Sequence, residues 1–349
     1  MTTDPRDAPA ETATTRLDQQ QFLSILSREE ALQRFEAALF PRPLPRETVA
    51  LGDALGRVSA TDILSPIDVP PFDRANVDGF ALRAADVAAS GQGRPVRLSL
   101  NAETLACGVA PTLPVAPGTA TPIATGGVVP RGADAVVMVE HTEPAGDGGV
   151  EIRRPAAPGQ FVSHAGSDMA AGELLLRAGT VMGSREIGML AACGIAEIPV
   201  TRRVRVAVLS TGDELVQPGE PLKPASVYDT NGAIVAAAIC ENGGDVTRLG
   251  AFPDDEAGLE AVLRAALADN DMVVLSGGTS KGAGDVSHRI IDRLGAPGIV
   301  AHGVALKPGK PLCLAVCDGK PVVILPGFPT SAMFTFHDMV APVLRRMGG

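Results

Sequence analysis

Beyond about residue 200, the sequence alternates short apolar runs with segments whose apolar residues recur at helical spacing. The apolar runs predict strands over 204–210, 245–252 and 271–278. The other segments predict helices over 231–244, 254–270 and 285–295. Such alternation is typical of a mainly parallel sheet that is covered by helices on both faces. We therefore expect a three-layer α/β domain over 201–349, in an α/β multidomain protein.

The first half of the chain follows a different pattern. Apolar residues at helical spacing over 21–40, with Ser27 as N-cap and Glu30 three residues later, predict one or two helices. A further helix is expected over 184–195, beginning at Ser184. Short apolar runs cut by Gly and Pro predict a β-rich domain between these helices. The expected organisation is a disordered tail (1–20), a helical linking domain (21–64 plus 171–200) and a β-rich domain (65–170).

The composition narrows the classes of partner. The net charge is −10, and the chain has no Trp and one Tyr, which argues against nucleic acid as a partner. No apolar run is long enough to span a membrane, and the N-terminus lacks the apolar core of a signal peptide. The five cysteines form no CxxC motif, so a zinc site has little support, and Cys313 and Cys317 should share one buried strand face. We expect a protein of the reducing cytoplasm.

Three loops that follow predicted strands combine glycines with carboxylates. In a parallel sheet the loops after 209, 252 and 275 should converge on one crevice. Glycine lets backbone N–H groups approach a phosphate, and carboxylates beside an anion require a hard cation such as Mg²⁺. The pattern predicts metal-assisted chemistry on a phosphate. The loop residues that carry it are Thr211, Gly212, Asp213, Glu214, Asp254, Asp255, Gly277, Gly278, Ser280 and Asp285.

Each loop also has a simpler interpretation. Asp254 alone is well explained as a helix N-cap, Asp285 likewise precedes a helix, and glycine after a strand is ordinary turn material. Lys281 stands between Ser280 and a glycine, which is not the order of a phosphate-binding P-loop.

Turns elsewhere in the chain allow similar alternatives. Lys307 and Lys310 flank a Pro-Gly turn and either supply positive charge or lie in solvent. A second turn, 326–329, should open a final helix with Thr330 or Ser331 as N-cap. The pairs Asp78-Gly79 and Thr125-Gly126, taken alone, predict only hairpin turns.

Taken together, eight ordered motifs resemble the molybdopterin molybdenumtransferase family, which includes the MoeA proteins and the E domain of gephyrin. The resemblance runs from about residue 20 to 349. It implies an α/β domain like that of MogA and an enzyme that uses Mg²⁺ to cleave adenylylated molybdopterin, releases AMP and places molybdate on the dithiolene. The motifs are "ANVDGFA", "IATGGVVPRGADAVVMVE", "AGSDMAAGELLLRAGT", "VAVLSTGDEL", "VYDTNG", "SGGTSKGAGD", "KPGKP" and "LPGFPTSA".

The resemblance also implies roles for particular residues. Glu214, Asp254 and Asp285 would handle the metal and the phosphoanhydride, and Lys307 would bind phosphate or molybdate. A homodimer would bring Asp78 and Thr125 into the crevice of the other subunit. The molybdopterin adenylyltransferase is a further expected partner. The pterin phosphate would be bound by Thr211, Gly212, Gly277, Gly278, Ser280, Pro326, Gly327 and Pro329.

The chain also departs from the family pattern. Typical members continue beyond the position of Gly349 into a small β domain, which this sequence is expected to lack. The alternatives to the transferase are a relative that uses tungstate, one that only adenylylates molybdopterin, and a non-catalytic pterin-binding scaffold. The departures within the matched motifs are Phe328 for a usual Asn, Thr330 for Val, Lys281 for an apolar residue, Val286 for Tyr, and Gly303 for a basic residue.

Overall fold

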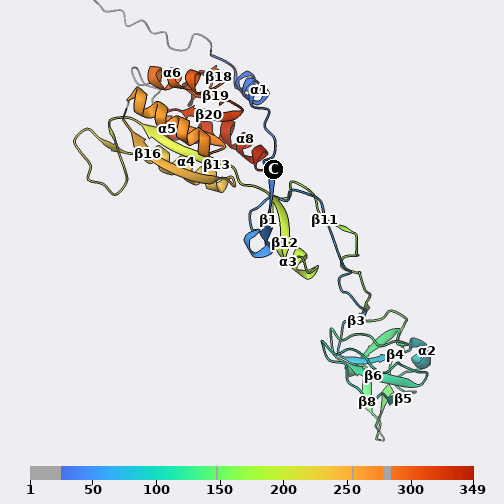
Figure 1. The fold of residues 1–349 in the computed structure, drawn as a ribbon. Helices are drawn as coiled ribbons and strands as arrows, with labels where there is room; N and C mark the ends of the chain where they lie inside the picture. Colours follow the sequence, from blue (N-terminus) through green and yellow to red (C-terminus); the bar gives the residue numbers. More distant parts are fainter. Residues whose placement is uncertain (1–24, 147, 254, 278–283) are drawn as a thin grey trace, which may run out of the picture. The chain divides into compact units, whose positions relative to one another are not determined.

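The computed structural model describes residues 25–146, 148–253, 255–277 and 284–349, with the backbone alone for 284–286. These residues form two compact units. The first combines the described part of Met1–Leu44 with Arg203–Gly348, and the second is Pro45–Arg202 with Gly349. The tail expected over 1–20 lies outside the described residues. Figure 1 shows the elements of both units.

The first unit is built on a six-stranded sheet in the order β16-β13-β17-β20-β19-β18. The first four strands of this order are parallel, and β19 and β18 are antiparallel to their neighbours. The mainly parallel sheet expected from the sequence is confirmed. Its strands are β13 (Arg205–Thr211), β16 (Asp245–Phe252), β17 (Met272–Gly277), β18 (Pro297–His302), β19 (Cys313–Cys317) and β20 (Lys320–Leu325), and a separate pair is β14 (Leu215–Val216) with β15 (Val227–Tyr228).

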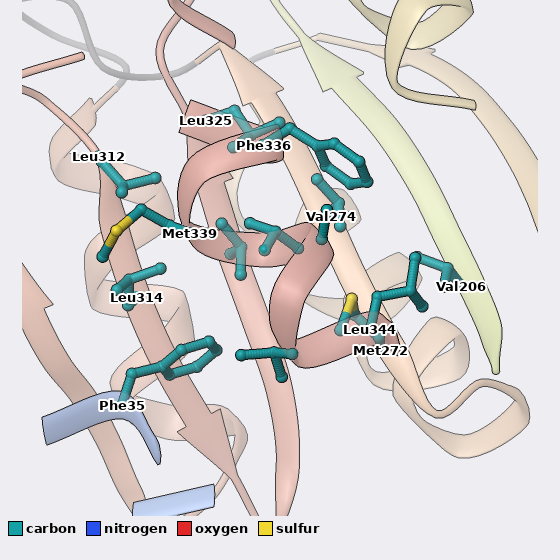
Figure 2. Close-up of a cluster of buried hydrophobic side chains, with 14 of the residues drawn as sticks. Phe35, Val206, Met272, Val274, Leu312, Leu314, Leu325, Phe336, Met339 and Leu344 are labelled. Carbon is teal, nitrogen blue, oxygen red and sulfur yellow. The ribbon is translucent and has the colours of Figure 1, made fainter. Parts of the chain in front are cut away.

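Helices cover both faces of this sheet, because side chains along each buried strand point alternately to opposite faces. Val206 and Val274 pack with α1, α4, α7 and α8 on one face, as Figure 2 shows in part. Ala207 and Leu275 pack with α5 and α6 on the other. The helices are α1 (Arg28–Leu39), α4 (Thr230–Glu241), α5 (Glu256–Asp269), α6 (Gly284–Leu294), α7 (Pro329–Thr335) and α8 (Ala341–Met347), with a π-helical turn, η3 (Phe336–Val340), between the last two.

The helix starts confirm some of the expected caps and correct others. Ser27 caps α1, and its hydroxyl accepts the N–H of Glu30. The cap of α5 is Asp255, whose carboxylate accepts the N–H of Gly258, so the role expected of Asp254 belongs to its neighbour. Asp285 does not precede α6, which already begins at Gly284.

The final helix also begins earlier than expected. Pro329 is the first residue of α7 and Phe328 occupies the cap position, so neither Thr330 nor Ser331 is the N-cap. Proline suits the first helical position because its fixed φ is already helical and its missing N–H would have no partner in the helix.

Cys313 and Cys317 are buried in β19, as the sequence predicts. Burial raises the pKa of the Cys317 thiol to about 11 and raises the pKa of Cys313 further. Both thiols are therefore protonated at neutral pH and serve as apolar core residues.

The second unit contains a six-stranded sheet, in the order β7-β4-β6-β5-β9-β8, and three two-stranded pairs, β1-β12, β10-β3 and β11-β2. Its strands are short and separated by turns, in agreement with the expected β-rich pattern. Its elements are β1 (Arg46–Ala50), η1 (Leu51–Asp53), β2 (Ile63–Leu64), β3 (Arg74–Ala75), β4 (Gly79–Leu82), α2 (Ala84–Val87), β5 (Val96–Leu100), β6 (Thr119–Ile123), β7 (Ala135–Met138), η2 (Val139–His141), β8 (Thr142–Pro144), β9 (Gly149–Ile152), β10 (Val162–Ser163), β11 (Leu174–Leu176), α3 (Ser184–Ala192) and β12 (Glu197–Thr201).

Two local expectations in this unit are wrong. Gly79 is not in a turn but begins β4, where a Cβ would lie 1.9 Å from the carbonyl oxygen of Val137, so only glycine allows this close approach. Ser184 is the first residue of α3 rather than its cap. The cap is Gly183, and its N–H donates a hydrogen bond to the carboxylate of Glu186.

No helix in the described ranges is long and apolar enough to cross a membrane.

Candidate functional site

A pocket of about 360 Å³ lies at the carboxyl edge of the sheet in the first unit. It is formed where β13, β17 and β20 end and where α4 and α7 begin. The expected convergence of strand-end loops is therefore observed for β13 and β17, and the loop after β20 joins them. The lining residues are Ser210, Thr211, Glu214, Leu215, Val227, Tyr228, Asp229, Thr230, Asn231, Ser276, Gly277, Gly327, Phe328 and Pro329.

Asn231, at the start of α4, links this helix to the end of β17 and to the loop after β20. Its Nδ2 donates to the Ser276 Oγ and to the carbonyl oxygen of Gly327, both at 2.7 Å. Because a carbonyl oxygen can only accept, this contact fixes which end of the amide faces Gly327. The Asn231 Oδ1 therefore points elsewhere, and it has no hydrogen-bond partner among the described residues.

Thr211 presents a second buried atom of this kind. Its side-chain Oγ1 has no hydrogen-bond partner in the part of the chain that the structure describes, although the residue is only 3% exposed. A buried polar atom without a partner costs about 1–3 kcal/mol. Thr211 and Asn231 both line the pocket, so a ligand that came into contact with these two atoms would recover this cost, and we treat them as candidate ligand contacts.

Asp229 connects the pocket to the start of α4. It is 2% exposed, and its Oδ1 accepts the hydroxyl of Ser210 at 2.7 Å and the N–H of Gly232 at 2.8 Å. The second bond is the N-cap of α4. Asp229 therefore ties the end of β13 to the helix that carries Asn231.

We expect Asp229→Ala to lower the free energy of unfolding by about 2 kcal/mol, because it removes a buried cap and leaves the Ser210 hydroxyl without its acceptor. Urea denaturation followed by circular dichroism measures the change. The matched control is Asp255→Ala, which removes the exposed cap of α5 and should cost about 1 kcal/mol. Equal losses in the two variants would contradict the connecting role of Asp229.

Glu214 supplies an exposed carboxylate at the mouth of the pocket. It folds back over the preceding turn, so that a Cβ on Gly212 would lie 2.7 Å from the Glu214 Oε2. Gly212 has a φ of +152°, a backbone conformation that residues with a side chain rarely adopt. The turn at Gly212 thus lets the Glu214 carboxylate lie close to the backbone beside the strand end.

The structure groups some of the expected site residues and separates others. Thr211, Glu214, Gly277, Gly327 and Pro329 line the pocket, and Gly212 adjoins it. Pro326 is buried behind the lining. Lys307 is exposed and is not a lining residue, and a Cβ on Gly309 of its turn would lie 2.4 Å from Thr335, at the far end of α7. Asp254, Gly278, Ser280 and Lys281 lie outside the described residues, as does the side chain of Asp285.

Asp78 and Thr125 meet in the second unit. The Asp78 Oδ1 accepts both the backbone N–H of Thr125, at 2.7 Å, and its hydroxyl, at 2.8 Å. These two bonds lower the pKa of Asp78, the backbone N–H having the larger effect. A lowered pKa keeps the carboxylate ionised at neutral pH, and the charge is lost only as the pH falls below the usual range for aspartate.

The donor atoms of the pocket suit a hard cation. Mg²⁺ prefers oxygen ligands, which a carboxylate, a hydroxyl and an amide oxygen all provide. Glu214, Thr211 and Asn231 offer these three donors, and the last two have no partner for them among the described residues. Within the described ranges, no three His, Cys, Asp or Glu side chains are grouped closely enough to hold a metal. The lining therefore offers the types of oxygen donor that Mg²⁺ binds, with Glu214 as its exposed carboxylate.

Sequence reasoning missed several lining residues, among them Tyr228, Asp229 and Asn231. They belong to the motif "VYDTNG", at the start of a predicted helix, where Asp and Asn are typical cap residues. A cap residue at the carboxyl edge of a parallel sheet was a signal that could have identified them. The strands β14 and β15 have two residues each, so they leave no periodic pattern in the sequence.

Comparisons with known proteins agree with this architecture. Residues 26–194 match the family model of the MoeA N-terminal region (domain I and II), and 207–346 match that of a probable molybdopterin binding domain. Molybdopterin molybdenumtransferase 2 of Mycobacterium tuberculosis is 39% identical over 309 residues, covering 86% of this chain and 75% of the relative. The molybdopterin molybdenumtransferase of Nostoc is 39% identical over 306 residues, covering 87% and 70%.

Solved structures extend the likeness to the fold. The crystal structure of a molybdopterin biosynthesis MoeA protein from Pyrococcus horikosii superposes with a TM-score of 0.83 at 39% identity, covering 93% of this chain and 81% of that chain. The sequence motifs, the pocket at the sheet edge and these relatives lead to one conclusion. The chain belongs to the MoeA family of molybdopterin molybdenumtransferases.

Proposed function

We propose that the pocket at the sheet edge binds adenylylated molybdopterin, and that the chain transfers molybdate to it with release of AMP in molybdenum cofactor biosynthesis. The observation that carries the proposal is the pair of buried atoms, Thr211 Oγ1 and Asn231 Oδ1, that lack partners among the described residues of the lining. Buried polar atoms without a partner are uncommon in folded proteins, and a ligand, an ion or a water molecule can supply the missing partner. These two are notable because both belong to residues of one pocket lining.

The start of α4 supports the phosphate-binding part of the proposal. Thr230 and Asn231, its first two residues, line the pocket. The first turn of a helix carries partial positive charge and backbone N–H groups without partners in the helix, both of which favour a phosphate group. The charge of Asp229 beside this turn is partly offset by the two hydrogen bonds that its carboxylate accepts.

Magnesium is the proposed cofactor. Bound Mg²⁺ would neutralise negative charge on the phosphoanhydride. Glu214, Thr211 and Asn231 would hold it, together with Asp254 and Asp285 as expected from the family resemblance. The support is that Glu214 is an exposed carboxylate among the residues that line the pocket.

A homodimer and a cytoplasmic location complete the proposal. In the dimer the Asp78–Thr125 pair of one subunit would reach the pocket of the other, where the Asp78 carboxylate would face the reacting phosphate and molybdate. The support is the hydrogen-bonded pair itself, which holds an ionised carboxylate on the surface of the second unit. Lys307 would add positive charge near the same site, and the molybdopterin adenylyltransferase would deliver the substrate.

The test is to incubate the purified chain with adenylylated molybdopterin, Mg²⁺ and molybdate and to measure AMP. We expect AMP release that depends on molybdate and stops when a chelator removes Mg²⁺. AMP release with tungstate but not with molybdate would show that the chain uses tungstate instead of molybdate. Binding of adenylylated molybdopterin without AMP release would overturn catalysis and leave a pterin-binding protein. AMP release in the presence of chelator would overturn the role of Mg²⁺.

A further inference from the structure

Two aromatic side chains line the polar pocket. Tyr228 is 42% exposed and Phe328 is 81% exposed, although both belong to the lining. An aromatic ring left in water at a binding cavity gives up the free energy that covering it would provide.

Both rings are attached to well-fixed backbone. Phe328 is the N-cap of α7, with Pro329 in the first turn, and the carbonyl oxygen of Gly327 before it is bonded by the Asn231 Nδ2. Tyr228 directly precedes Asp229, the buried cap of α4. Its hydroxyl donates to the carbonyl oxygen of Glu220 at 3.1 Å, which restricts the ring.

We propose that Phe328 and Tyr228 stack on the planar heteroaromatic ring of the substrate that enters this pocket. The inference rests on the proposed function, because it assigns the part of adenylylated molybdopterin that the two side chains recognise. That substrate carries two flat nitrogen-containing rings, the pterin and the adenine. Each ring has a π-face that an aromatic side chain can cover.

Phe328 can be changed with little effect on folding. At 81% exposure it buries little surface, and its backbone role as a cap uses no side-chain hydrogen bond. Phe334 provides a matched control, since it lies on the same helix, is 46% exposed and is not a lining residue. If Phe328 only contacts another protein surface, replacing Phe328 and replacing Phe334 should have the same effect on probe binding.

The composition of the chain provides a direct optical signal. The protein has one tyrosine and no tryptophan, so its tyrosine fluorescence comes from Tyr228 alone. Titration with AMP tests the adenine ring, and titration with a phosphorylated hydroxymethylpterin tests the pterin ring. We expect quenching of Tyr228 by at least one of them. If at least one probe binds in calorimetry and neither probe changes this fluorescence, the role of Tyr228 is overturned.

The variant Phe328→Leu tests the second ring. We expect it to bind the stacking probe about 10-fold more weakly, because stacking on one aromatic side chain contributes on the order of a tenfold change in affinity. Phe328→Trp should keep the affinity and place the chain's single tryptophan in the pocket, where the same probe quenches it. Phe334→Leu should bind as the unchanged chain does.

The outcomes separate this inference from the proposed function. If the unchanged chain and Phe328→Leu release AMP and bind both probes equally well, the stacking role is wrong while the transferase function stands. If Phe328→Leu and Phe334→Leu both alter the mass of the assembly and leave probe binding unchanged, Phe328 covers a protein surface instead. If the unchanged chain binds neither probe nor adenylylated molybdopterin, the proposed function fails and the stacking role fails with it.

Discussion

Glu214→Gln is expected to reduce molybdate-dependent AMP release about 100-fold, because it removes a negative charge from the mouth of the pocket where the phosphoanhydride and Mg²⁺ are proposed to meet. Glutamine has nearly the same shape as glutamate, so the contact over Gly212 is kept and the local backbone should not change. A weaker metal site should also raise the Mg²⁺ concentration that gives half of the maximal rate. Both quantities are measured by following AMP at a series of Mg²⁺ concentrations.

The control for this experiment is Glu220→Gln. Glu220 lies between β14 and β15, in the same segment as Glu214, but it is not a lining residue, and the contact that it makes with Tyr228 uses its backbone carbonyl. The substitution removes the same charge and should leave the rate and the Mg²⁺ dependence unchanged. Equal effects of the two substitutions would mean that the rate responds to the overall charge of the segment, and would remove Glu214 from the site.

The framework of the pocket could be predicted from the sequence because it depends on local patterns. The buried strands β13 and β17 appear as continuous apolar runs, and parallel strands bring their carboxyl ends to one edge. Thr211, Glu214 and Gly277 follow or end these runs, so the topology alone brings them together.

Other contacts, in the pocket and in the second unit, cannot be predicted from spacing. The bond from Asn231 to Gly327 joins residues 96 positions apart, and the Asp78–Thr125 pair spans 47 positions. The role predicted for Asp78 comes only from the family resemblance, because spacing alone makes its neighbour Gly79 a turn residue rather than the start of a strand. Long-range side-chain contacts of this kind follow from tertiary packing and leave no periodic signal.

The glycines of the pocket differ in how strictly the structure requires them. Gly277 ends β17 with a φ of +96°, and a Cβ there would lie 2.3 Å from the carbonyl oxygen of Thr211 on the neighbouring strand. Gly327 also lines the pocket, but a Cβ there would meet no atom within 4 Å, and its φ is not in the left-handed range. Alanine at position 277 therefore tests whether β13 and β17 must pack closely. Alanine at position 327 tests the effect of an added methyl group in the pocket without a contact between strands.

Gly277→Ala is expected to lower the free energy of unfolding by about 3 kcal/mol, since the methyl group must push β17 away from β13 and the alanine must adopt a left-handed φ. The same displacement moves Thr211 and should reduce AMP release. Gly327→Ala should change the unfolding free energy by no more than about 0.5 kcal/mol. Urea unfolding followed by Tyr228 fluorescence reports on the first unit alone, because the chain's one tyrosine lies there. Equal stability of the two variants would show that β13 and β17 can separate at this edge without cost, and that the close approach of Gly277 to Thr211 does not hold the pocket together.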